Sequence, residues 1–143
     1  MRVFIDTNLW VYRLDRREPD KRAFVRDWIR KVAQDHEIVI STQVLIEFRS
    51  VLSRKFDPPL SNADLRAALE ALAEFDAVPA NASLVLDAHE LAQRVNLFWF
   101  DTLIAEAATR SGCSVIYSED FNHGQRFGEL TAHNPFRKGE REP

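Results

Sequence analysis

The sequence is poor in cysteine, glycine and proline. Its 143 residues include one cysteine, four glycines and six prolines. A single cysteine excludes an internal disulfide and is typical of a reducing compartment, where such a residue usually behaves as a small buried apolar one. Cys113 is therefore given no chemical role. Because no linker rich in glycine or proline interrupts the chain, we expect one domain over residues 1–143, with a mobile polar tail from residue 136 onward.

Long apolar runs are absent as well. No uncharged apolar stretch approaches the roughly 20 residues that a membrane-spanning helix needs, and no basic N-terminal region precedes a long apolar segment. We therefore expect a cytoplasmic protein with no membrane partner. The net charge of −3 also excludes a strong overall basic field, so any binding of nucleic acid has to depend on local patches.

Arginine supplies most of the positive charge, because 15 of the 19 basic residues are Arg and four are Lys. Arg binds phosphate oxygens with a planar fork and also stacks on bases. Six arginines lie close together within the first 30 residues: Arg13, Arg16, Arg17, Arg22, Arg26 and Arg30. For any one of them, a solvated helix face is a simpler interpretation than a defined RNA track.

Short apolar segments alternate with amphipathic ones along the chain. Strands are predicted over residues 2–5, 37–40, 77–78, 113–117 and 130–132. Helices are predicted over residues 7–14, 18–34, 42–57, 61–75, 81–95 and 100–111. Strands that alternate with helices are typical of an α/β fold, so we expect a central parallel sheet with helices on both faces.

Two acidic residues directly follow predicted strands. Asp6 comes after the first strand, and Asp120 comes shortly after the strand that ends at Tyr117. In open parallel sheets, sites lie beyond the carboxyl ends of the strands, so both acids should point to one edge. Taken alone, each has a simpler interpretation: a helix cap for Asp6, and a turn or cap for Asp120.

Glu47 and Asp101 lie within the apolar stripes of two predicted helices. Glu47 is three residues after Val44 and four before Val51, and Asp101 precedes Ile104 by three. An ionised carboxylate that faces a core is costly unless it is paired or binds a metal. A salt bridge to an arginine inside the core is the alternative explanation for either residue.

Together, the four acids can converge on one edge of the sheet, where they would repel one another without positive charge between them. Oxygen ligands with no Cys or His pair nearby favour Mg²⁺ or Mn²⁺. Thr7, Asn8 and Ser118 add neutral polar groups that could hold a metal-bound water or orient a carboxylate, although capping explains them equally well. We expect Glu119 to face solvent, with an auxiliary acid as the alternative. We expect His123 to make backbone contacts in a loop, with a general acid as the alternative.

Four segments together resemble a known family. FIDTN at the N-terminus, STQVLIEF, FWFDTLIAEAA, and YSEDFNHGQRFGEL followed by NPF occur in this order over essentially the whole chain. The pattern resembles PIN-domain proteins, and among them toxins of the VapC type. This resemblance implies a three-layer α/β/α fold and an RNA endonuclease that depends on Mg²⁺ or Mn²⁺. It also implies a cognate antitoxin, a toxin homodimer and toxin–antitoxin hetero-oligomers.

The resemblance also assigns residue roles. The family's acidic quartet, which is both catalytic and metal-binding, falls on Asp6, Glu47, Asp101 and Asp120, with Thr7, Asn8 and Ser118 in supporting positions. A metal held there would lower the pKa of a bound water to form the nucleophile, and would stabilise charge on the scissile phosphate. No protein nucleophile is then needed.

Two other functions fit part of the pattern. A phosphatase with an aspartyl nucleophile also has an Asp after its first strand, but it usually has a second acid where this chain has Asn8. A phospho-accepting receiver module needs a late Lys near its acidic site, and Lys138 in the polar tail is the one late Lys here.

Aromatic residues are candidates for a partner surface. They are Trp10, Tyr12, Trp28 and the run Phe98-Trp99-Phe100. Because aromatic residues at helical spacing more often belong to the core, we expect only some of them to line a groove or a dimer contact.

Overall fold

A computed structural model of the protein describes residues 1–137 and contains a six-stranded sheet. The strands are β1 (Arg2–Ile5), β2 (Glu37–Ser41), β3 (Asp76–Val78), β4 (Val115–Tyr117), β5 (Arg126–Phe127) and β6 (Leu130–His133). Their order is β3-β2-β1-β4-β6-β5, and every neighbouring pair is parallel except β5 and β6. The predicted α/β class and central parallel sheet are therefore confirmed.

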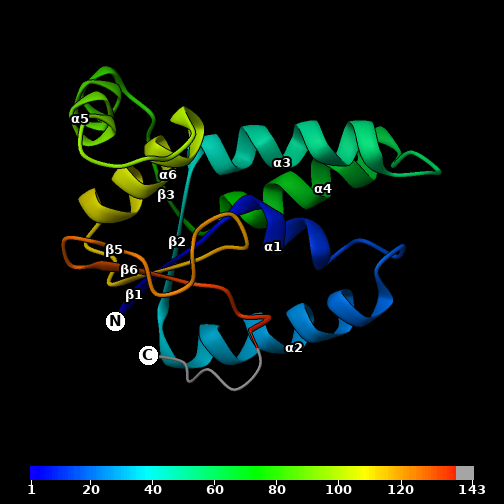
Figure 1. Cartoon of the computed structure of the whole chain (residues 1–143). Coiled ribbons are helices and arrows are strands. Elements are labelled where there is room, and N and C mark those ends of the chain that lie inside the picture. Colours follow the sequence, from blue (N-terminus) through cyan, green and yellow to red (C-terminus); the bar gives the residue numbers. More distant parts are fainter. Residues whose placement is uncertain (138–143) are drawn as a thin grey trace.

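The helices cover both faces of this sheet. They are α1 (Thr7–Tyr12), α2 (Pro19–Asp35), α3 (Thr42–Lys55), α4 (Asn62–Ala73), α5 (Ala82–Ala92) and α6 (Trp99–Arg110). Figure 1 shows α2 on one side of the sheet and α5 with α6 on the other. The helices α1, α3 and α4 pack together toward the carboxyl ends of β1 and β2 (Figure 1). The elements that follow β1, β2 and β4 thus meet at one end of the sheet.

Short polar side chains determine where several helices begin. Ser41, Ser61 and Asn81 each accept a hydrogen bond from the backbone N–H three residues later, which satisfies a donor that a helix start leaves free. Pro19 occupies the first turn of α2, where a missing N–H costs nothing. These four predicted starts are confirmed to within one residue. The predicted last helix begins at Trp99, one residue earlier than expected.

The hydrophobic core lies between the sheet and the helices. Val3, Phe4 and Ile5 of β1 are fully buried, which explains why the strand shows no polar alternation. Trp10 and Trp28 also belong to the core, so they are not part of a partner surface. Cys113 is buried, as a small apolar residue would be, and has no disulfide partner among the described residues.

A hairpin near the end of the described residues joins β6, which was predicted over residues 130–132, to β5, which was not predicted. The strands β5 and β6 are antiparallel, and Gly128 in the turn between them has φ of +63°, a conformation that favours glycine. After the hairpin, Phe136 packs against Tyr12 and Phe24. Most of the tail predicted to be mobile lies outside the described residues. Within residues 1–137, no helix has the length and apolar character needed to cross a membrane.

Candidate active site

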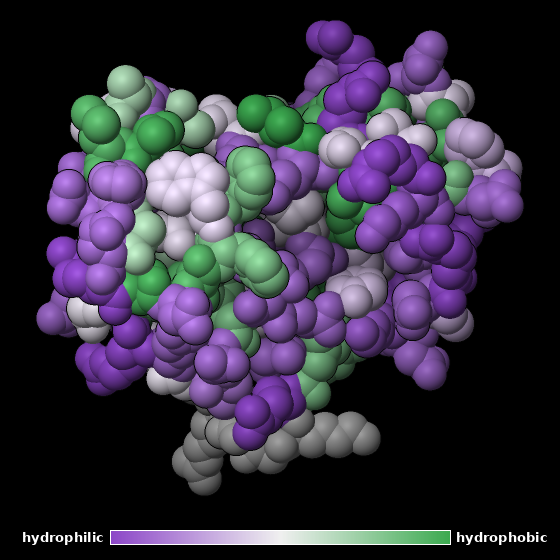
Figure 2. Space-filling view, turned by 45° about the horizontal axis from the view of Figure 1, so that its top comes forward, coloured by the Kyte–Doolittle hydropathy of each residue, from purple (hydrophilic) through white to green (hydrophobic). Residues whose placement is uncertain are grey.

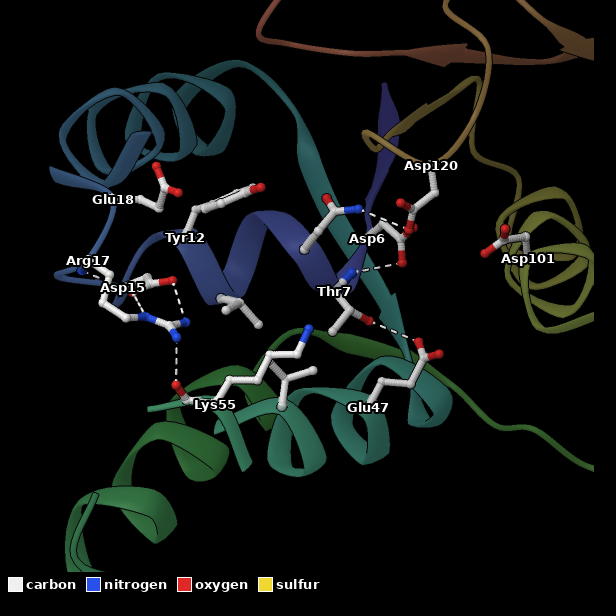
Figure 3. A pocket seen from close by; sticks show the side chains of 13 residues that line it. Asp6, Thr7, Tyr12, Asp15, Arg17, Glu18, Glu47, Lys55, Asp101 and Asp120 are labelled. Carbon is white, nitrogen blue, oxygen red and sulfur yellow. Dashed lines mark hydrogen bonds and ion pairs between the residues drawn. The ribbon is translucent and has the colours of Figure 1, made fainter. Parts of the chain in front are cut away.

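A pocket of about 400 Å³ opens at the carboxyl ends of β1, β2 and β4. The four predicted acids line it together with Thr7, Asn8, Val11, Tyr12, Asp15, Arg17, Glu18, Val51 and Lys55. Figure 3 shows the carboxylates arriving from separate segments: Asp6 after β1, Glu47 from α3, Asp101 from α6, and Asp120 from the loop after β4. The tertiary structure thus brings all four acids to one hollow. Figure 2 shows a hollow at the centre of this face.

Asp6 is the most buried of the four carboxylates, with 3% of its surface exposed. Its Oδ1 accepts a 2.7 Å hydrogen bond from the Thr7 N–H, and its Oδ2 accepts a 2.8 Å bond from the Ser118 hydroxyl. Burial raises the pKa of Asp6 to about 7 although both hydrogen bonds lower it; the charges of Asp120 and Glu47 raise it further. Asp6 therefore caps α1 and also lines the pocket, so the two interpretations of this residue are compatible.

The loop after β4 is held against the end of β1 by polar contacts. Ser118 Oγ accepts the Asp120 N–H at 3.0 Å while it donates to Asp6. The Asn8 side-chain amide donates to Asp120 Oδ2 at 3.1 Å. Burial raises the pKa of Asp120, and the bond from Asn8 opposes that rise. Ser118 and Asn8 consequently determine how Asp6 and Asp120 lie relative to each other.

Glu47 reaches the pocket from α3, which begins where β2 ends. It is half-buried, and its Oε1 accepts a 3.0 Å hydrogen bond from the Thr7 hydroxyl. The helical spacing predicted this inward direction, because Val44 and Phe48 on the same stripe are buried. Thr7 thereby links the carboxylates of Asp6 and Glu47 through its backbone N–H and its hydroxyl.

Asp101 lies in the first turn of α6 and is half-buried. The Gln43 side chain donates a 3.0 Å hydrogen bond to the Phe100 carbonyl, which fixes the start of α6 against α3. Burial raises the pKa of Asp101 to about 6, with further contributions from the charges of Asp120 and Glu47. This coupling indicates that the carboxylates act on one another across the pocket.

None of the four carboxylates forms an ion pair with Lys, Arg or His within residues 1–137. The alternative of an arginine inside the core is therefore wrong for Glu47 and Asp101. The cluster therefore carries like charges that no ion pair compensates among the described residues. Burial is the main cause of the raised pKa values of Asp6 and Asp101, and the charges of Asp120 and Glu47 raise them further. Such a site favours any cation that can enter the pocket.

The donor set suits a hard divalent cation. Carboxylate and amide oxygens are the ligands that Mg²⁺ and Mn²⁺ prefer, and the Asn8 Oδ1 is buried with no hydrogen-bond partner in the described chain. However, no three Asp, Glu, His or Cys side chains among residues 1–137 stand close enough to hold a metal by themselves. Mg²⁺ usually keeps several waters and binds through one or two carboxylates, so an open site of this kind is compatible with it.

A cluster beside the pocket was not predicted from the sequence. The Tyr12 hydroxyl donates to Glu119 Oε1 at 2.7 Å, and Lys21 Nζ donates to Glu119 Oε2 at 3.1 Å. The Lys21 ammonium also lies 4.6 Å from the centre of the Tyr12 ring and 5.0 Å from that of Phe136. The expectation that Glu119 faces solvent is therefore wrong, since its side chain is 25% exposed and is held by two partners. The sequence did not show which of the two adjacent acids, Glu119 or Asp120, would be solvated and which would be paired.

His123 lies in the loop before the hairpin. Its Nδ1 accepts a 3.0 Å hydrogen bond from the Asn134 N–H, so the expected backbone contact is confirmed. His123 does not line the acidic pocket.

The sequence matches the family model of the PIN domain over residues 3–126. The chain belongs to the PIN-domain family. The sheet with helices on both faces is therefore the fold of a PIN domain. No curated protein sequence matches the chain.

Two solved structures show the same fold. One is a VapBC2 complex from Rickettsia felis bound to a DNA fragment from its promoter: TM-score 0.67, 19% identity, covering 94% of this chain and 98% of that one. The other is VapC20 from Mycobacterium tuberculosis, described as a toxin that cleaves the sarcin–ricin loop: TM-score 0.56, 18% identity, covering 80% of this chain and 86% of that one. At these identities the likeness concerns the fold alone.

Proposed function

We propose that this PIN-domain protein is a metal-dependent RNA endonuclease of the VapC type, and acts as the toxin of a cytoplasmic toxin–antitoxin pair. One observation carries the proposal. Carboxylates from four distant segments line one pocket, and no ion pair neutralises any of them within the described chain. In the hydrolysis of a phosphodiester, negative charge develops on the phosphate and on the leaving oxygen, and positive charge nearby stabilises it. A pocket lined by four carboxylates favours the binding of a cation that can supply this positive charge.

In this proposal the catalytic residues hold Mg²⁺, or Mn²⁺ in its place. Asp6 and Asp101 would bind the metal directly, and Asp120 and Glu47 would hold it directly or through metal-bound water. When bound, the metal supplies a water of lowered pKa and stabilises charge on the scissile phosphate. Ser118 holds Asp6 and thereby fixes the direction of one carboxylate oxygen.

The Asn8 amide holds Asp120 by donating a hydrogen bond, and Thr7 holds both Asp6 and Glu47. These contacts hold three of the four carboxylates in place, and they leave Glu47 Oε2 and Asp120 Oδ1 without a hydrogen-bond donor among the described residues. Preorganised charge of this kind is what accelerates a phosphoryl reaction.

The similar structures support a protein partner as part of the proposal. One of them is a VapBC2 complex and the other a toxin that cleaves RNA of the sarcin–ricin loop. We therefore propose a cognate antitoxin, and assembly through a toxin homodimer. Large apolar side chains are exposed on α3, on α5 and around the start of α6, and they offer surface for assembly: Ile46, Val85, Leu86, Phe98, Trp99 and Phe100. Figure 2 shows several apolar areas on one face of the molecule, with polar surface between them.

RNA cleavage by purified protein tests the proposed function. The protein should cut RNA with Mg²⁺ or Mn²⁺ and stop when EDTA removes the metal. Asp6→Asn and Asp101→Asn should each lower the rate by about a hundredfold or more, because each removes a charge that holds the metal. Asp87→Asn is the matched control, since Asp87 pairs with Arg110 away from the pocket.

Normal cleavage by both folded pocket variants would show that the site is assigned wrongly. Release of phosphate from a small phosphomonoester, with no cleavage of RNA, would favour the aspartyl phosphatase instead. Modification by acetyl phosphate would favour the receiver-like module, whose expected partner Lys138 lies outside the described residues.

A further inference from the structure

A second groove adjoins the acidic pocket. It has a volume of about 640 Å³ and lies between the α1–α2 connection and the α3–α4 connection. Leu14, Phe56 and Leu60 contribute apolar surface, and each also packs against the core. Asp15 and Arg17 line both hollows, so the groove and the acidic pocket share a wall.

Arg17 forms part of this wall and is held there by hydrogen bonds from its guanidinium group. Its guanidinium donates to both carboxylate oxygens of Asp15, at 2.9 Å and 3.0 Å, and to the Lys55 carbonyl at 2.6 Å. It also lies 5.5 Å from the centre of the Phe56 ring. Figure 3 shows Arg17 between Asp15 and the end of α3. Arg17 therefore ties the α1–α2 connection to α3.

Three further arginines line the groove, and they outnumber its two unpaired carboxylates by one. Within residues 1–137, Arg13, Arg16 and Arg22 form no ion pair, and neither do the groove carboxylates Asp57 and Asp64. Outside the Asp15–Arg17 pair, the groove thus has three positive and two negative charges, and its excess of arginine favours an anion.

The surroundings of two of these arginines strengthen that conclusion. The Nε of Arg22 is buried and has no hydrogen-bond partner in the described part of the chain, which is costly for a strong donor. Burial and the nearby charge of Arg26 lower the pKa of Arg13. Arg26 does not line the groove, so the unpaired Nε of Arg22 is the observation that points to an acceptor there.

We propose that this groove, defined by Arg13, Arg16 and Arg22, binds phosphodiester groups of a single-stranded RNA that continues from the acidic pocket. The inference rests on the proposed function, because it extends the path of the same substrate. Guanidinium groups bind phosphate oxygens in forked pairs, and the apolar side chains of the groove offer surface to a ribose or base. An acidic peptide could also meet arginines, but continuity with a phosphodiester site favours the nucleic acid.

RNA binding without cleavage tests the groove. All proteins carry Asp6→Asn, and fluorescence anisotropy follows a labelled single-stranded RNA over a range of salt concentrations. The variant Arg16→Gln/Arg22→Gln should bind the RNA at least about tenfold more weakly. The slope of log Kd against log salt concentration should also fall by about one for each lost phosphate contact. The control Arg30→Gln/Arg94→Gln removes the same charge away from the groove and should bind like the parent.

Exposed Arg16 provides a second variant in case the half-buried Arg22 is needed for folding. Arg16→Glu alone should weaken binding more than Arg30→Glu, while thermal unfolding shows both to be folded. Equal affinity and equal salt dependence for the groove and control variants would overturn the proposal. So would displacement of the RNA by a polyglutamate peptide as effectively as by unlabelled RNA. If the groove variants lose RNA binding while the protein with native Asp6 fails to cut RNA, the groove stands and the nuclease function fails.

Discussion

The Ser118 hydroxyl donates a hydrogen bond to the Asp6 carboxylate at 2.8 Å across a separation of 112 residues. The same oxygen accepts the Asp120 N–H, so one small side chain joins the ends of β1 and β4 at the acidic pocket. The bond lowers the pKa of Asp6 against the effect of burial. Ser118 therefore helps to keep a buried carboxylate ionised.

Ser118→Ala should raise the pKa of Asp6 above about 7 and shift the acidic limb of the cleavage profile to higher pH. It should also lower the free energy of unfolding by about 1–3 kcal/mol, because a buried polar group loses its partner. A pH–rate profile and denaturant unfolding provide the measurements. Ser114→Ala is the matched control, since the buried Ser114 hydroxyl has no hydrogen-bond partner among the described residues. Identical pH profiles for the two variants would contradict the role of Ser118.

The pKa of Asp6 is 3.8 in the unfolded chain and about 7 in the folded protein. In the absence of metal, the free energy of unfolding should therefore fall as the pH rises between these two values. The sign follows because a carboxyl with a raised pKa holds its proton more tightly in the folded protein, so protonation stabilises the fold. The effect is on the order of a few kcal/mol. Thermal unfolding in EDTA measures it, and Asp6→Asn should remove this part of the slope. A slope that is the same in wild type and Asp6→Asn would rule out a raised pKa for Asp6.

Lys21→Met should weaken the binding of Mn²⁺ by about tenfold, since it removes an outer contact that orients the Asp120 loop. The physical reason is that Lys21 pairs with Glu119, the residue before Asp120. Calorimetric titration with Mn²⁺ gives the affinity, and Lys21→Arg should restore part of it. Lys31→Met is the control on the same helix, because Lys31 pairs with exposed Asp27. Unchanged affinity in Lys21→Met would leave the cluster with a purely structural role.

Phe98→Ser should weaken self-association, because 84% of the Phe98 side chain is exposed in the single chain. Burial of such a ring in a dimer would stabilise the dimer by about 1.5–3 kcal/mol. Sedimentation at several protein concentrations measures the change, with Arg30→Ser as a surface control. A wild-type protein that stays monomeric at all concentrations would refute assembly through the exposed apolar side chains.

Local sequence patterns predicted the elements because their causes are local. Buried runs such as residues 3–5 identified strands, and Ser61 and Asn81 identified helix starts through bonds to residues three positions away. The two-residue strand β5 was missed because it is too short to show a period. Its pairing is decided by contact with β6.

The sequence by itself determined which residue types stand at the strand ends and on the helix stripes, and therefore which carboxylates could meet. The tertiary structure alone decided that they line one pocket with no ion pair among the described residues, and that Glu119 is held by Tyr12 and Lys21. It also decided that Arg13, Arg16 and Arg22, which lie near one another in the sequence, line a groove beside that pocket. The reason is physical: helical and strand periods determine the direction of a side chain, but its partner across more than a hundred residues depends on how the elements pack.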